Sequence, residues 1–592
     1  MENGSYRIFK DKVVIRIKDR VCDTPTELLS SKLFLQMLAQ SIKTLSHRNS
    51  HLLGVFENKD IDGEDIRLLI ETLIYLTKLP AELVQRVVKG SDQFFRNPSL
   101  FNAFVEFLYN YWREMQRVII CDSQGEQYDQ RPYRTFNNTI ESLTHLVRST
   151  YRDIQENITG NHPRIYRQVR AGAEIATIAM AKEIPYPNSH FRILNDISII
   201  RQVLIYPPLI FNPPMNKRSG VFERVGRNPL EFINIHEKDE WLCYPAKVGP
   251  LVIMVYFTLG FFELGFSLCN LFELADDEDL QRRPDAIYLF GVPEDQFPKL
   301  GKSQTIFYDD DTMDGVLVGA VPDNPKFGYF GYLKKMILTL HNIKMMKLHR
   351  LPFHGAMVNL SIRNKGSFTV LIMGDTGAGK SETLEALRAV AGDTVEEMTI
   401  IADDMGSLNL QDGGAVTGFG TETGAFVRLD DLQPGFAFGQ IDRTIIMSPA
   451  QVNARVVLPV TTYETIMRGY KPDLVLYANN YDPVDADHPI LQRFATATEA
   501  INTFREGAVM SKGTTTTSGL VHTYFANVFG PEQYQDLHDP LAWEYFQTFF
   551  DLGIFVGQMR TRLGLPGQER TGPEEAARAL LEKLMKFDDQ SS

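Results

Sequence analysis

The segment Gly374–Ser381 has the residue types and spacing of a phosphate-binding loop, Gly-Asp-Thr-Gly-Ala-Gly-Lys-Ser. It lies between an apolar run and a helical pattern, as the GxxxxGK[ST] motif requires. Glycines let backbone amides close around phosphate oxygens, and the N-terminus of the following helix adds a positive pole. Lys380 can reach the β- and γ-phosphates, and the Ser381 hydroxyl can ligate a magnesium ion. The residues expected to bind a nucleoside triphosphate are Gly374, Asp375, Thr376, Gly377, Ala378, Gly379, Lys380, Ser381 and Glu382.

Two adjacent carboxylates, Asp403 and Asp404, follow the apolar run Ile400–Ala402. Carboxylates at the end of a strand, downstream of a phosphate loop, are typical of a metal ligand and a catalytic base. A solvated pair that ends a strand would have the same sequence. The loop upstream favours the functional interpretation.

The elements that position these residues are predicted to form an α/β domain from Phe353 onward. TVLIM (369–373) and MTIIADD (398–404) are predicted strands, and SETLEALRAV (381–390) is a predicted helix. Upstream, AIYLFGV (286–292) and GVLVGAV (315–321) are predicted strands, and TGPEEAARALLEKLMKF (571–587) is a predicted capped helix.

The N-terminal region, from about residue 25 to 182, is predicted to be helical. DIRLLIETLIYLTKL (65–79) and LFNAFVEFLYNYWREMQRVII (100–120) have apolar residues at helical spacing. Pro25 and Pro80 mark expected first helical positions. Proline-rich loops begin near Pro185. We therefore predict a helical accessory domain (1–182), an α/β lobe (183–330) and a nucleotide- and metal-binding domain with a mixed sheet and a C-terminal helical tail (331–592).

Composition narrows the class of protein. The chain has 592 residues and a net charge of −13, which argues against a nucleic-acid binder. Four separated cysteines and a charged N-terminus without an apolar core suggest a cytoplasmic protein. Gly249–Phe272 is long enough to span a bilayer, but Glu263 lies within it, and a buried strand running into a buried helix explains it equally well. We expect no membrane association.

Residues 329–459 resemble the phosphoenolpyruvate carboxykinase and HPr kinase superfamily, and ATP-dependent phosphoenolpyruvate carboxykinase most closely. Tyr329–Lys335 is similar to that family's Tyr-x-Gly-x-x-Lys-Lys segment. Phe353-His354-Gly355-Ala356 falls where the family has a metal-binding histidine, and Asn453–Pro459 is similar to its Asn-x-Arg segment. The loop and the aspartate pair stand between them in the family's order.

The resemblance implies roles for single residues. Lys335, His354 and Asp404 would bind a manganese ion, and Ser381 with the nucleotide phosphates would hold a magnesium ion. Lysine must lose its proton to act as a ligand. A neighbouring dication and partial burial can lower its pKa, and the adjacent cation Lys334 acts in the same direction. The remaining implied roles are contact with the transferred phosphate for Arg455, contact with substrate for Tyr329, and stabilisation of phosphate charge for Lys334 and Lys380. Arg218 is a weak candidate for the arginine that holds the substrate carboxylate.

A second resemblance, to HPr kinase/phosphorylase, rests on the Gly-Lys-Ser-Glu and Ala-Asp-Asp runs. In that family an aspartate of the pair is the base for a serine hydroxyl, which would be the role of Asp403 or Asp404 here. The chain departs from the carboxykinase pattern at Met405-Gly406-Ser407, and the N-terminal domain has no counterpart in either family. Lys512–Gly519 is similar in position to the carboxykinase lid.

Three functions are therefore open. The leading one is conversion of oxaloacetate and ATP to phosphoenolpyruvate, ADP and carbon dioxide, with Lys335, Lys380, Asp403, Asp404 and Arg455 as the catalytic set. The alternatives are a kinase that acts on a hydroxyl of a protein or small molecule, and a catalytically silent nucleotide-binding regulator. ATP is preferred over GTP by the order of the segments alone. A protein partner or self-association through the N-terminal domain is a further expectation.

Overall fold

The computed structural model describes residues 5–9, 11–18, 21–58, 60–123, 130–297, 299–313, 315–432, 441–511, 519–528 and 533–587, with backbone alone at 130–138 and 431. The chain is a mixed α/β protein that divides into two compact units. Unit 1 comprises Met1–Lys182 and Ser198–Tyr206. Unit 2 comprises Glu183–Ile197 and Pro207–Ser592.

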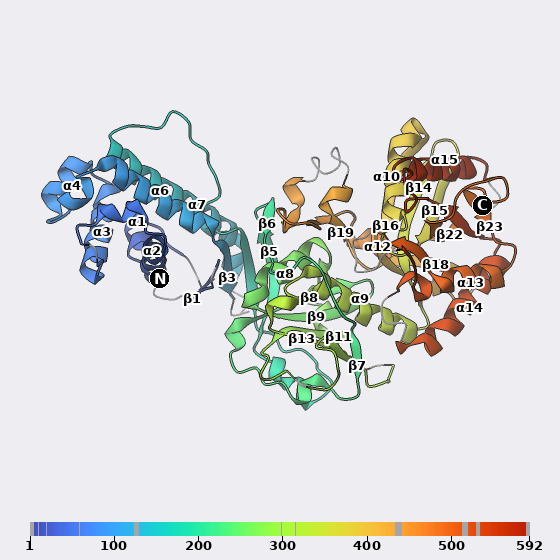
Figure 1. The fold of residues 1–592 in the computed structure, drawn as a ribbon. Helices are drawn as coiled ribbons and strands as arrows, with labels where there is room; N and C mark the ends of the chain where they lie inside the picture. The colour runs from blue at the N-terminus through green and yellow to red at the C-terminus, as the bar shows by residue number, and fades with distance from the viewer. Residues whose placement is uncertain are drawn as a thin grey trace. The chain divides into compact units, whose positions relative to one another are not determined.

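Unit 1 combines a sheet with two groups of packed helices (Figure 1). The sheet order is β1-β2-β3-β4-β5, in which β2, β3 and β4 are parallel and both outer pairs are antiparallel. Its elements are β1 (Ser5–Ile8), β2 (Lys12–Ile17), α1 (Pro25–Leu29), α2 (Lys32–His47), α3 (Gly63–Leu76), α4 (Ala81–Val87), α5 (Asp92–Phe95), α6 (Pro98–Glu114), β3 (Gln116–Asp122), α7 (Gln130–Thr159), β4 (Ile175–Met180) and β5 (Ser198–Ile205).

The prediction of an all-helical region from 25 to 182 is wrong at β3 and β4. The helix expected over 100–120 ends at Glu114, and the rest of that pattern is strand β3. Val118, Ile119 and Ile120 are fully buried, so they do not form one face of an amphipathic helix. β-branched residues pack well on a sheet that is covered on both faces, and that environment decides the conformation.

Arg117 fixes the turn from α6 into β3. Its guanidinium donates to the carbonyl oxygens of Trp112, Met115 and Gly172, each at 2.6 Å, and pairs with Glu174 at 3.0 Å. A buried arginine is tolerated only with such partners. The sequence pattern carries no trace of these contacts, because two of them come from residues more than 50 positions away.

Helix starts follow local chemistry. Pro25 occupies a first-turn position of α1, and the Thr24 hydroxyl accepts a hydrogen bond from the Glu27 amide at 3.2 Å. Pro80 stands one position earlier than expected, as the N-cap residue of α4. At the C-terminus the expected helix is present, but Arg570 precedes it and no side chain caps it.

Unit 2 contains two larger sheets. The first has the order β8-β9-β11-β13-β12-β7, with β10 on β8, and its central strands β9, β11 and β13 are parallel. Its elements, with the smaller strand β6 and helices α8 and α9, are β6 (Leu209–Phe211), β7 (Glu223–Val225), β8 (Trp241–Val248), β9 (Leu251–Thr258), α8 (Phe262–Ser267), β10 (Glu273–Leu274), β11 (Ala286–Val292), β12 (Ile306–Tyr308), β13 (Leu317–Pro322) and α9 (Phe330–Lys347).

The apolar stretch Gly249–Phe272 is a buried strand, β9, that runs into the short buried helix α8. Among the residues described, no helix has the length and apolar character needed to cross a membrane. Strand β9 pairs with β8 and β11, and all of its residues are buried, so the apolar stretch belongs to the core of unit 2.

The second sheet has the order β18-β17-β14-β15-β22-β26-β23, with β16 also paired to β14. It mixes parallel and antiparallel pairs. The remaining elements of unit 2 are β14 (Leu351–Ile362), β15 (Gly366–Met373), α10 (Lys380–Ala391), β16 (Val395–Ala402), β17 (Met405–Leu410), β18 (Val416–Gly420), β19 (Gly424–Arg428), β20 (Ile445–Met447), β21 (Arg455–Pro459), α12 (Tyr463–Met467), β22 (Leu474–Asn479), β23 (Leu491–Arg493), α13 (Ala497–Glu506), β24 (Ala508–Ser511), β25 (Gly519–His522), α14 (Gln535–Asp551), β26 (Phe555–Arg560) and α15 (Thr571–Met585).

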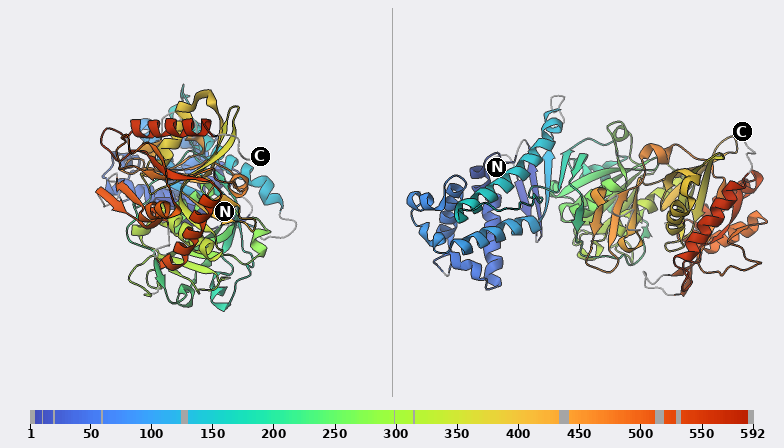
Figure 2. Two further views of the ribbon diagram at one scale, coloured as in Figure 1. Left: turned by 90° about the vertical axis from the view of Figure 1, so that its right-hand side faces the viewer. Right: turned by 90° about the horizontal axis from the view of Figure 1, so that it is seen from above.

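Helices α10 and α15 pack side by side against the core of this second sheet (Figures 1 and 2). The expected strand, glycine turn and helix at 369–390 are confirmed as β15 and α10, and the expected strands at 286–292, 315–321 and 398–404 as β11, β13 and β16. The boundary expected after residue 330 falls at the start of α9, which contacts strands of both sheets. Lys512–Ser518 of the expected lid lie outside the described residues.

Candidate functional site

Three segments of unit 2 carry the central polar residues of the candidate site. Lys334 and Lys335 lie near the start of α9, His354 lies on β14, and Asp403 and Asp404 form the link between β16 and β17. The Gly355 amide donates to the Asp404 carbonyl at 2.9 Å, and the Gly374 amide donates to the His354 carbonyl at 3.0 Å. Backbone pairing therefore sets the aspartate link and the glycine loop on either side of β14.

Gly355 makes this pairing possible by its small size. A Cβ atom at this position would lie 2.5 Å from the carbonyl oxygen of Ile372 and 3.0 Å from the Cα of Met373. Strands β14 and β15 approach so closely here that a larger residue would push them apart. The glycine after His354 thus fixes the histidine relative to the end of β15, where the glycine loop begins.

Asp404 is the centre of the charge network. Its Oδ1 lies 2.9 Å from His354 Nε2, and its Oδ2 accepts from Lys334 Nζ at 2.8 Å. Lys335 Nζ lies 3.9 Å from the same Oδ2. Burial alone would raise the pKa of Asp404, but both lysines and the His354 hydrogen bond lower it well below its usual value. Asp404 is therefore ionised.

Lys335 has the electrostatic setting that a lysine ligand needs. Burial lowers its pKa to about 8, against the attraction of Asp404, and the charges of Lys334 and Arg218 add to the lowering. A primary amine with that pKa loses its proton far more readily than an exposed lysine. The amine, an imidazole and a carboxylate form a mixed nitrogen and oxygen donor set that suits a borderline divalent cation.

His354 is oriented from behind by a strained turn. Its Nδ1 donates to the Ala526 carbonyl at 2.5 Å, which leaves Nε2 facing Asp404. Phe525, Ala526 and Asn527 all have positive φ angles, of 46°, 55° and 60°. Three successive residues in that region are unfavourable and persist only where tertiary contacts hold them. The turn thus presents the carbonyl that fixes the orientation of the histidine ring.

The resemblance assigns His354 to a Mn²⁺ site. On that assignment Ala526→Val should weaken Mn²⁺ binding by about tenfold to 100-fold, because a β-branched residue disfavours this backbone conformation and an outer hydrogen bond to a ligating histidine carries that much affinity. Titration of Mn²⁺ followed by electron paramagnetic resonance measures the change. Ala526→Gly is the matched control, since glycine accepts positive φ, and it should keep affinity within about threefold. Equal affinity in the valine variant would contradict the role of the turn.

The glycine loop has the backbone that its motif predicts. Gly379 has a φ of 94°, and a Cβ there would lie 2.6 Å from Thr561 Oγ1. Thr561 donates to the Ala378 carbonyl at 2.7 Å, and Asn480 donates to the Gly377 carbonyl at 2.8 Å. Sequence reasoning missed Asn480 and Thr561. Both stand just beyond the ends of neighbouring strands, β22 and β26, which is the one indication of their position.

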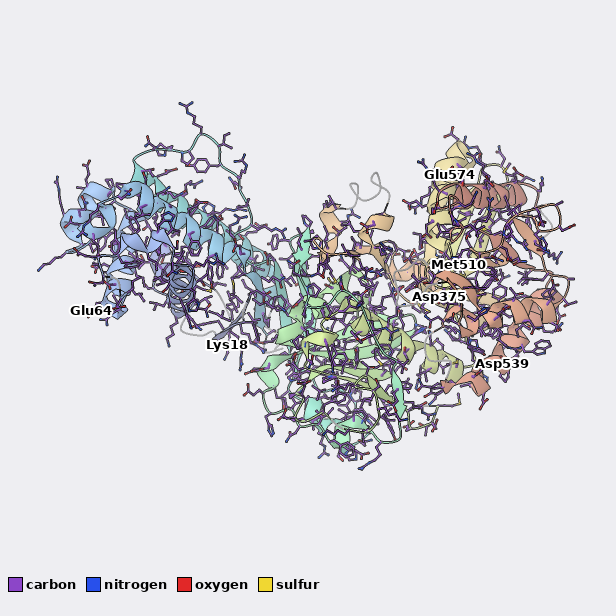
Figure 3. The ribbon with its side chains drawn as sticks, in the orientation of Figure 1. Lys18, Glu64, Asp375, Met510, Asp539 and Glu574 are labelled. Carbon is purple, nitrogen blue, oxygen red and sulfur yellow. The ribbon has the colours of Figure 1, made fainter. Side chains whose placement is uncertain are left out.

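Lys380 lies folded over its own loop. Its Nζ donates to the carbonyl oxygens of Gly374 at 2.6 Å and Asp375 at 3.1 Å. Ser381 and Thr376 are exposed. Asp375, labelled in Figure 3, has one carboxylate oxygen 3.8 Å from His354 Nδ1. The loop and the His354–Asp404 pair therefore belong to one continuous site.

Asp403 is the member of the aspartate pair that interacts electrostatically with Lys380 of the glycine loop. Burial raises its pKa to about 6, with Lys334 acting against the rise and Asp404 adding to it. The charges of Lys380 and Glu382 also act on Asp403. Two neighbouring carboxylates therefore have opposite shifts, which is the arrangement that gives such pairs different chemical roles.

The residues expected to contact substrate lie in the same neighbourhood. The Arg455 guanidinium stands 5.4 Å from the ring centroid of Phe426, and the Tyr329 ring stands 5.9 Å from it. Burial raises the pKa of Tyr329, and Arg455 acts in the opposite direction. Among the described residues, Arg455 Nε is buried and has no hydrogen-bond partner. An unsatisfied guanidinium nitrogen of this kind is a ready donor for an anionic ligand.

Arg218 also reaches this neighbourhood. Burial lowers its pKa, and its charge interacts with Tyr329 and Lys335. Its Nη1 donates to the Gly220 carbonyl at 2.8 Å, and its guanidinium lies 5.0 Å from the Phe222 ring. The structure thus brings the weakest of the sequence-based candidates near the lysine pair.

Glu422 is a site residue that sequence reasoning missed. It follows β18 and is 1% exposed, with one oxygen 3.2 Å from Lys334 Nζ. Burial raises its pKa to about 8, and Lys334 acts against the rise. Lys334 thus lies between Asp404 and Glu422, which hold its amine in place. The sequence Thr-Glu-Thr carries no feature that distinguishes this glutamate from an exposed one.

Glu422→Gln should alter how stability depends on pH. Because the folded pKa is raised, the wild-type protein keeps a proton that the unfolded chain loses, so its stability falls as pH rises from about 4.5 to 8. The variant lacks this loss, so its stability relative to wild type should increase with pH by more than about 1 kcal/mol. Urea unfolding of metal-free protein between pH 5 and 9 measures the difference, with the exposed Glu582→Gln as control. A difference that does not change with pH would contradict the assignment.

Among the described residues, no group of three or more histidine, cysteine, aspartate or glutamate side chains is arranged to hold a metal ion. The set Lys335, His354 and Asp404 contains two such side chains, with an amine as the third donor. Comparison with models of known protein families and with curated protein sequences finds no match to this chain.

Proposed function

We propose that unit 2 catalyses ATP-dependent phosphoryl transfer of the carboxykinase type, converting oxaloacetate and ATP to phosphoenolpyruvate, ADP and carbon dioxide. The observation that carries the proposal is the convergence of Lys334, Lys335 and His354 on Asp404. A solvated lysine pair and a packed histidine would not share one ionised carboxylate beside a glycine loop. The proposed fold is that of the phosphoenolpyruvate carboxykinase and HPr kinase superfamily, which the order of these segments resembles.

The nucleotide is assigned to the glycine loop. Loop amides and the first amides of α10 would donate hydrogen bonds to the phosphates, and Lys380 would leave the Gly374 and Asp375 carbonyls to contact them. Ser381 would hold Mg²⁺, which neutralises phosphate charge when bound. The exposed position of Ser381 in the first turn of α10 is compatible with this role.

The second metal is assigned to Lys335, His354 and Asp404. These residues fit the ion because Lys335 Nζ and His354 Nε2 lie 3.9 Å and 2.9 Å from the carboxylate oxygens of Asp404, and because the pKa of Lys335 is lowered to about 8. Mn²⁺, when bound there, supplies a Lewis acid that stabilises negative charge on a substrate oxygen. Ala526 holds the opposite ring nitrogen, so a metal at Nε2 would take the place of the hydrogen bond that this nitrogen makes with Asp404.

The chain's own residues would orient the reactants. We assign Arg218 to binding of the substrate carboxylate and Tyr329 to contact with the face of the substrate. As the carbon–carbon bond to the departing carboxylate breaks, its electron pair forms an enolate. The enolate oxygen then attacks the γ-phosphorus, the bond to the bridging oxygen breaks, and ADP leaves. Lys334, Lys380 and Arg455 would stabilise the charge on the transferring group.

The test is production of phosphoenolpyruvate by the full-length protein from oxaloacetate, ATP and MnCl₂, followed in a coupled assay. We expect phosphoenolpyruvate and ADP in equal amounts, with no product when ATP or metal is omitted. Carbon dioxide alone would not count, because a metal in solution can promote decarboxylation. Tight ATP binding by folded protein without phosphoenolpyruvate would refute the carboxykinase proposal.

A kinase that acts on a hydroxyl is the second candidate, favoured by the Asp403 carboxyl. Its pKa of about 6 suits a general base near neutral pH, and Lys380 lies close enough to influence it. ADP formation with a serine-containing protein or a small alcohol, and none with oxaloacetate, would support this candidate. ATP binding without any turnover would support a regulatory nucleotide-binding protein instead.

A further inference from the structure

Unit 1 contains a partly open cavity of about 110 Å³ that is lined by residues of both of its hydrophobic clusters. Helices α2, α6 and α7 carry most of the lining, and Figure 1 shows these helices. Met37, Leu143 and Val147 belong to one cluster, and Val105 and Ile154 belong to the other. Apolar side chains dominate the walls, so the cavity interrupts the core at the point where the clusters would otherwise join.

A void of this size is unusual in a folded protein. Interiors are packed to the density of organic crystals, and voids larger than a water molecule are few. An apolar cavity of about 150 Å³ stays free of water and binds benzene. The cavity in unit 1 is of the same order, and small side chains at Cys22, Ser31 and Thr150 leave it open.

One polar group at the cavity is unsatisfied. Thr150 is 3% exposed, and among the described residues its hydroxyl has no hydrogen-bond partner. Threonines in helices commonly donate to the carbonyl four residues earlier. Thr44, Thr72 and Thr159 of unit 1 all do so, at 2.7 to 2.9 Å. Within the described part of the chain the Thr150 hydroxyl lacks that bond, and Thr150 is one of the residues that line the cavity.

Three other polar groups of the lining are already engaged. Ser31 Oγ accepts from the Phe34 amide at 3.1 Å, and Trp112 Nε1 donates to the Ala171 carbonyl at 2.6 Å. The Tyr151 hydroxyl bonds to Glu106.

We propose that this cavity binds a small monocyclic aromatic molecule with one hydrogen-bonding substituent, of the phenol class. The apolar walls would take the ring, and the Thr150 hydroxyl would bond to the substituent. A buried polar group without a partner is costly, and a ligand of this chemistry satisfies it while filling the void. The proposal concerns unit 1 alone and does not depend on the chemistry proposed for unit 2.

Calorimetric titration of the full-length protein with phenol and with toluene tests the proposal, because the two probes have nearly the same size and differ in the hydroxyl. We expect both to bind. Thr150→Val preserves the side chain's shape and should weaken phenol about threefold to tenfold while it leaves toluene within about twofold. Val147→Phe, which fills the cavity, should abolish binding of both probes.

Thr159→Val, at an exposed threonine of the same helix, is the matched control and should leave both affinities unchanged. Absence of phenol binding to wild type would overturn the proposal. Equal weakening of phenol and toluene by Thr150→Val would also overturn it, since the hydroxyl would then have no selective role. The isosteric variant decides the question even if the cavity-filling variant does not fold.

Discussion

His354→Ala is expected to remove manganese-dependent turnover while nucleotide binding persists. The change deletes the imidazole that faces Asp404 at 2.9 Å and leaves two of the three proposed donors. Loss of an outer-shell hydrogen bond already weakens metal binding by about tenfold to 100-fold, so loss of a ligand should exceed about 100-fold. Phosphoenolpyruvate formation should fall by about a thousandfold, in line with removal of a principal charge-stabilising group.

Two measurements on one preparation separate the effects. Electron paramagnetic resonance gives the affinity for Mn²⁺, and calorimetry gives the affinity for ATP, which should stay within about threefold of wild type because the nucleotide loop is intact. His341→Ala is the matched control, since His341 is equally buried and its imidazole bonds to Asn342. It should lower stability without weakening Mn²⁺ binding. Full turnover in His354→Ala would refute the proposed metal set.

Local sequence patterns were sufficient to predict the structure where a single segment determines its own backbone conformation. The glycine loop is specified by eight consecutive residues, and the apolar runs that became β11, β13 and β15 have a single plausible conformation in a buried sheet. The pattern over 100–120 was misleading because Val118–Ile120 suits either a helix or a buried strand, and contacts with β2 and β4 decide between them.

The candidate site shows the same limit. The aspartate pair was identified because adjacent carboxylates after an apolar run are visible in a sequence, and the lysine pair because its segment resembles that of the carboxykinase. Glu422 and the Ala526 carbonyl were not, because a lone glutamate and a backbone oxygen gain their roles only when distant segments meet. Lys334 and Glu422 are 88 positions apart, and His354 and Ala526 are 172 apart. No periodicity reports such contacts.

The lysine pair illustrates how position divides two identical residues. Lys334 is buried between Asp404 and Glu422. Burial acts to lower the pKa of its amine, but the negative charges of these two carboxylates raise it overall. Lys335, one residue further along α9, lies 3.9 Å from Asp404 and has Lys334 and Arg218 as positive neighbours. Lys334 is therefore held as a cation, whereas Lys335 loses its proton more easily than an ordinary lysine. That difference underlies the separate roles proposed for the two residues.

Lys380→Met is expected to cause the second large effect, a loss of nucleotide binding and of turnover with Mn²⁺ affinity retained. Methionine approximates the volume of the lysine stem but removes the charge that would meet the phosphates. Deleting one partner of a buried charge pair costs about 2 to 5 kcal/mol, which corresponds to a decrease in ATP affinity of roughly 30-fold or more. Calorimetric titration with ATP and magnesium measures this decrease directly.

The same substitution also tests how the loop is held without nucleotide. Lys380 Nζ satisfies the Gly374 and Asp375 carbonyls, so its loss leaves those acceptors to water and should reduce stability by about 1 kcal/mol. Lys365→Met, in the turn between β14 and β15, is the control and should leave ATP affinity and turnover as in wild type. Because Asn480 and Thr561 hold the loop carbonyls independently, the loop should stay folded in Lys380→Met. Wild-type ATP affinity in that variant would mean that Gly374–Ser381 is not the nucleotide site, independently of the affinity measured for Mn²⁺.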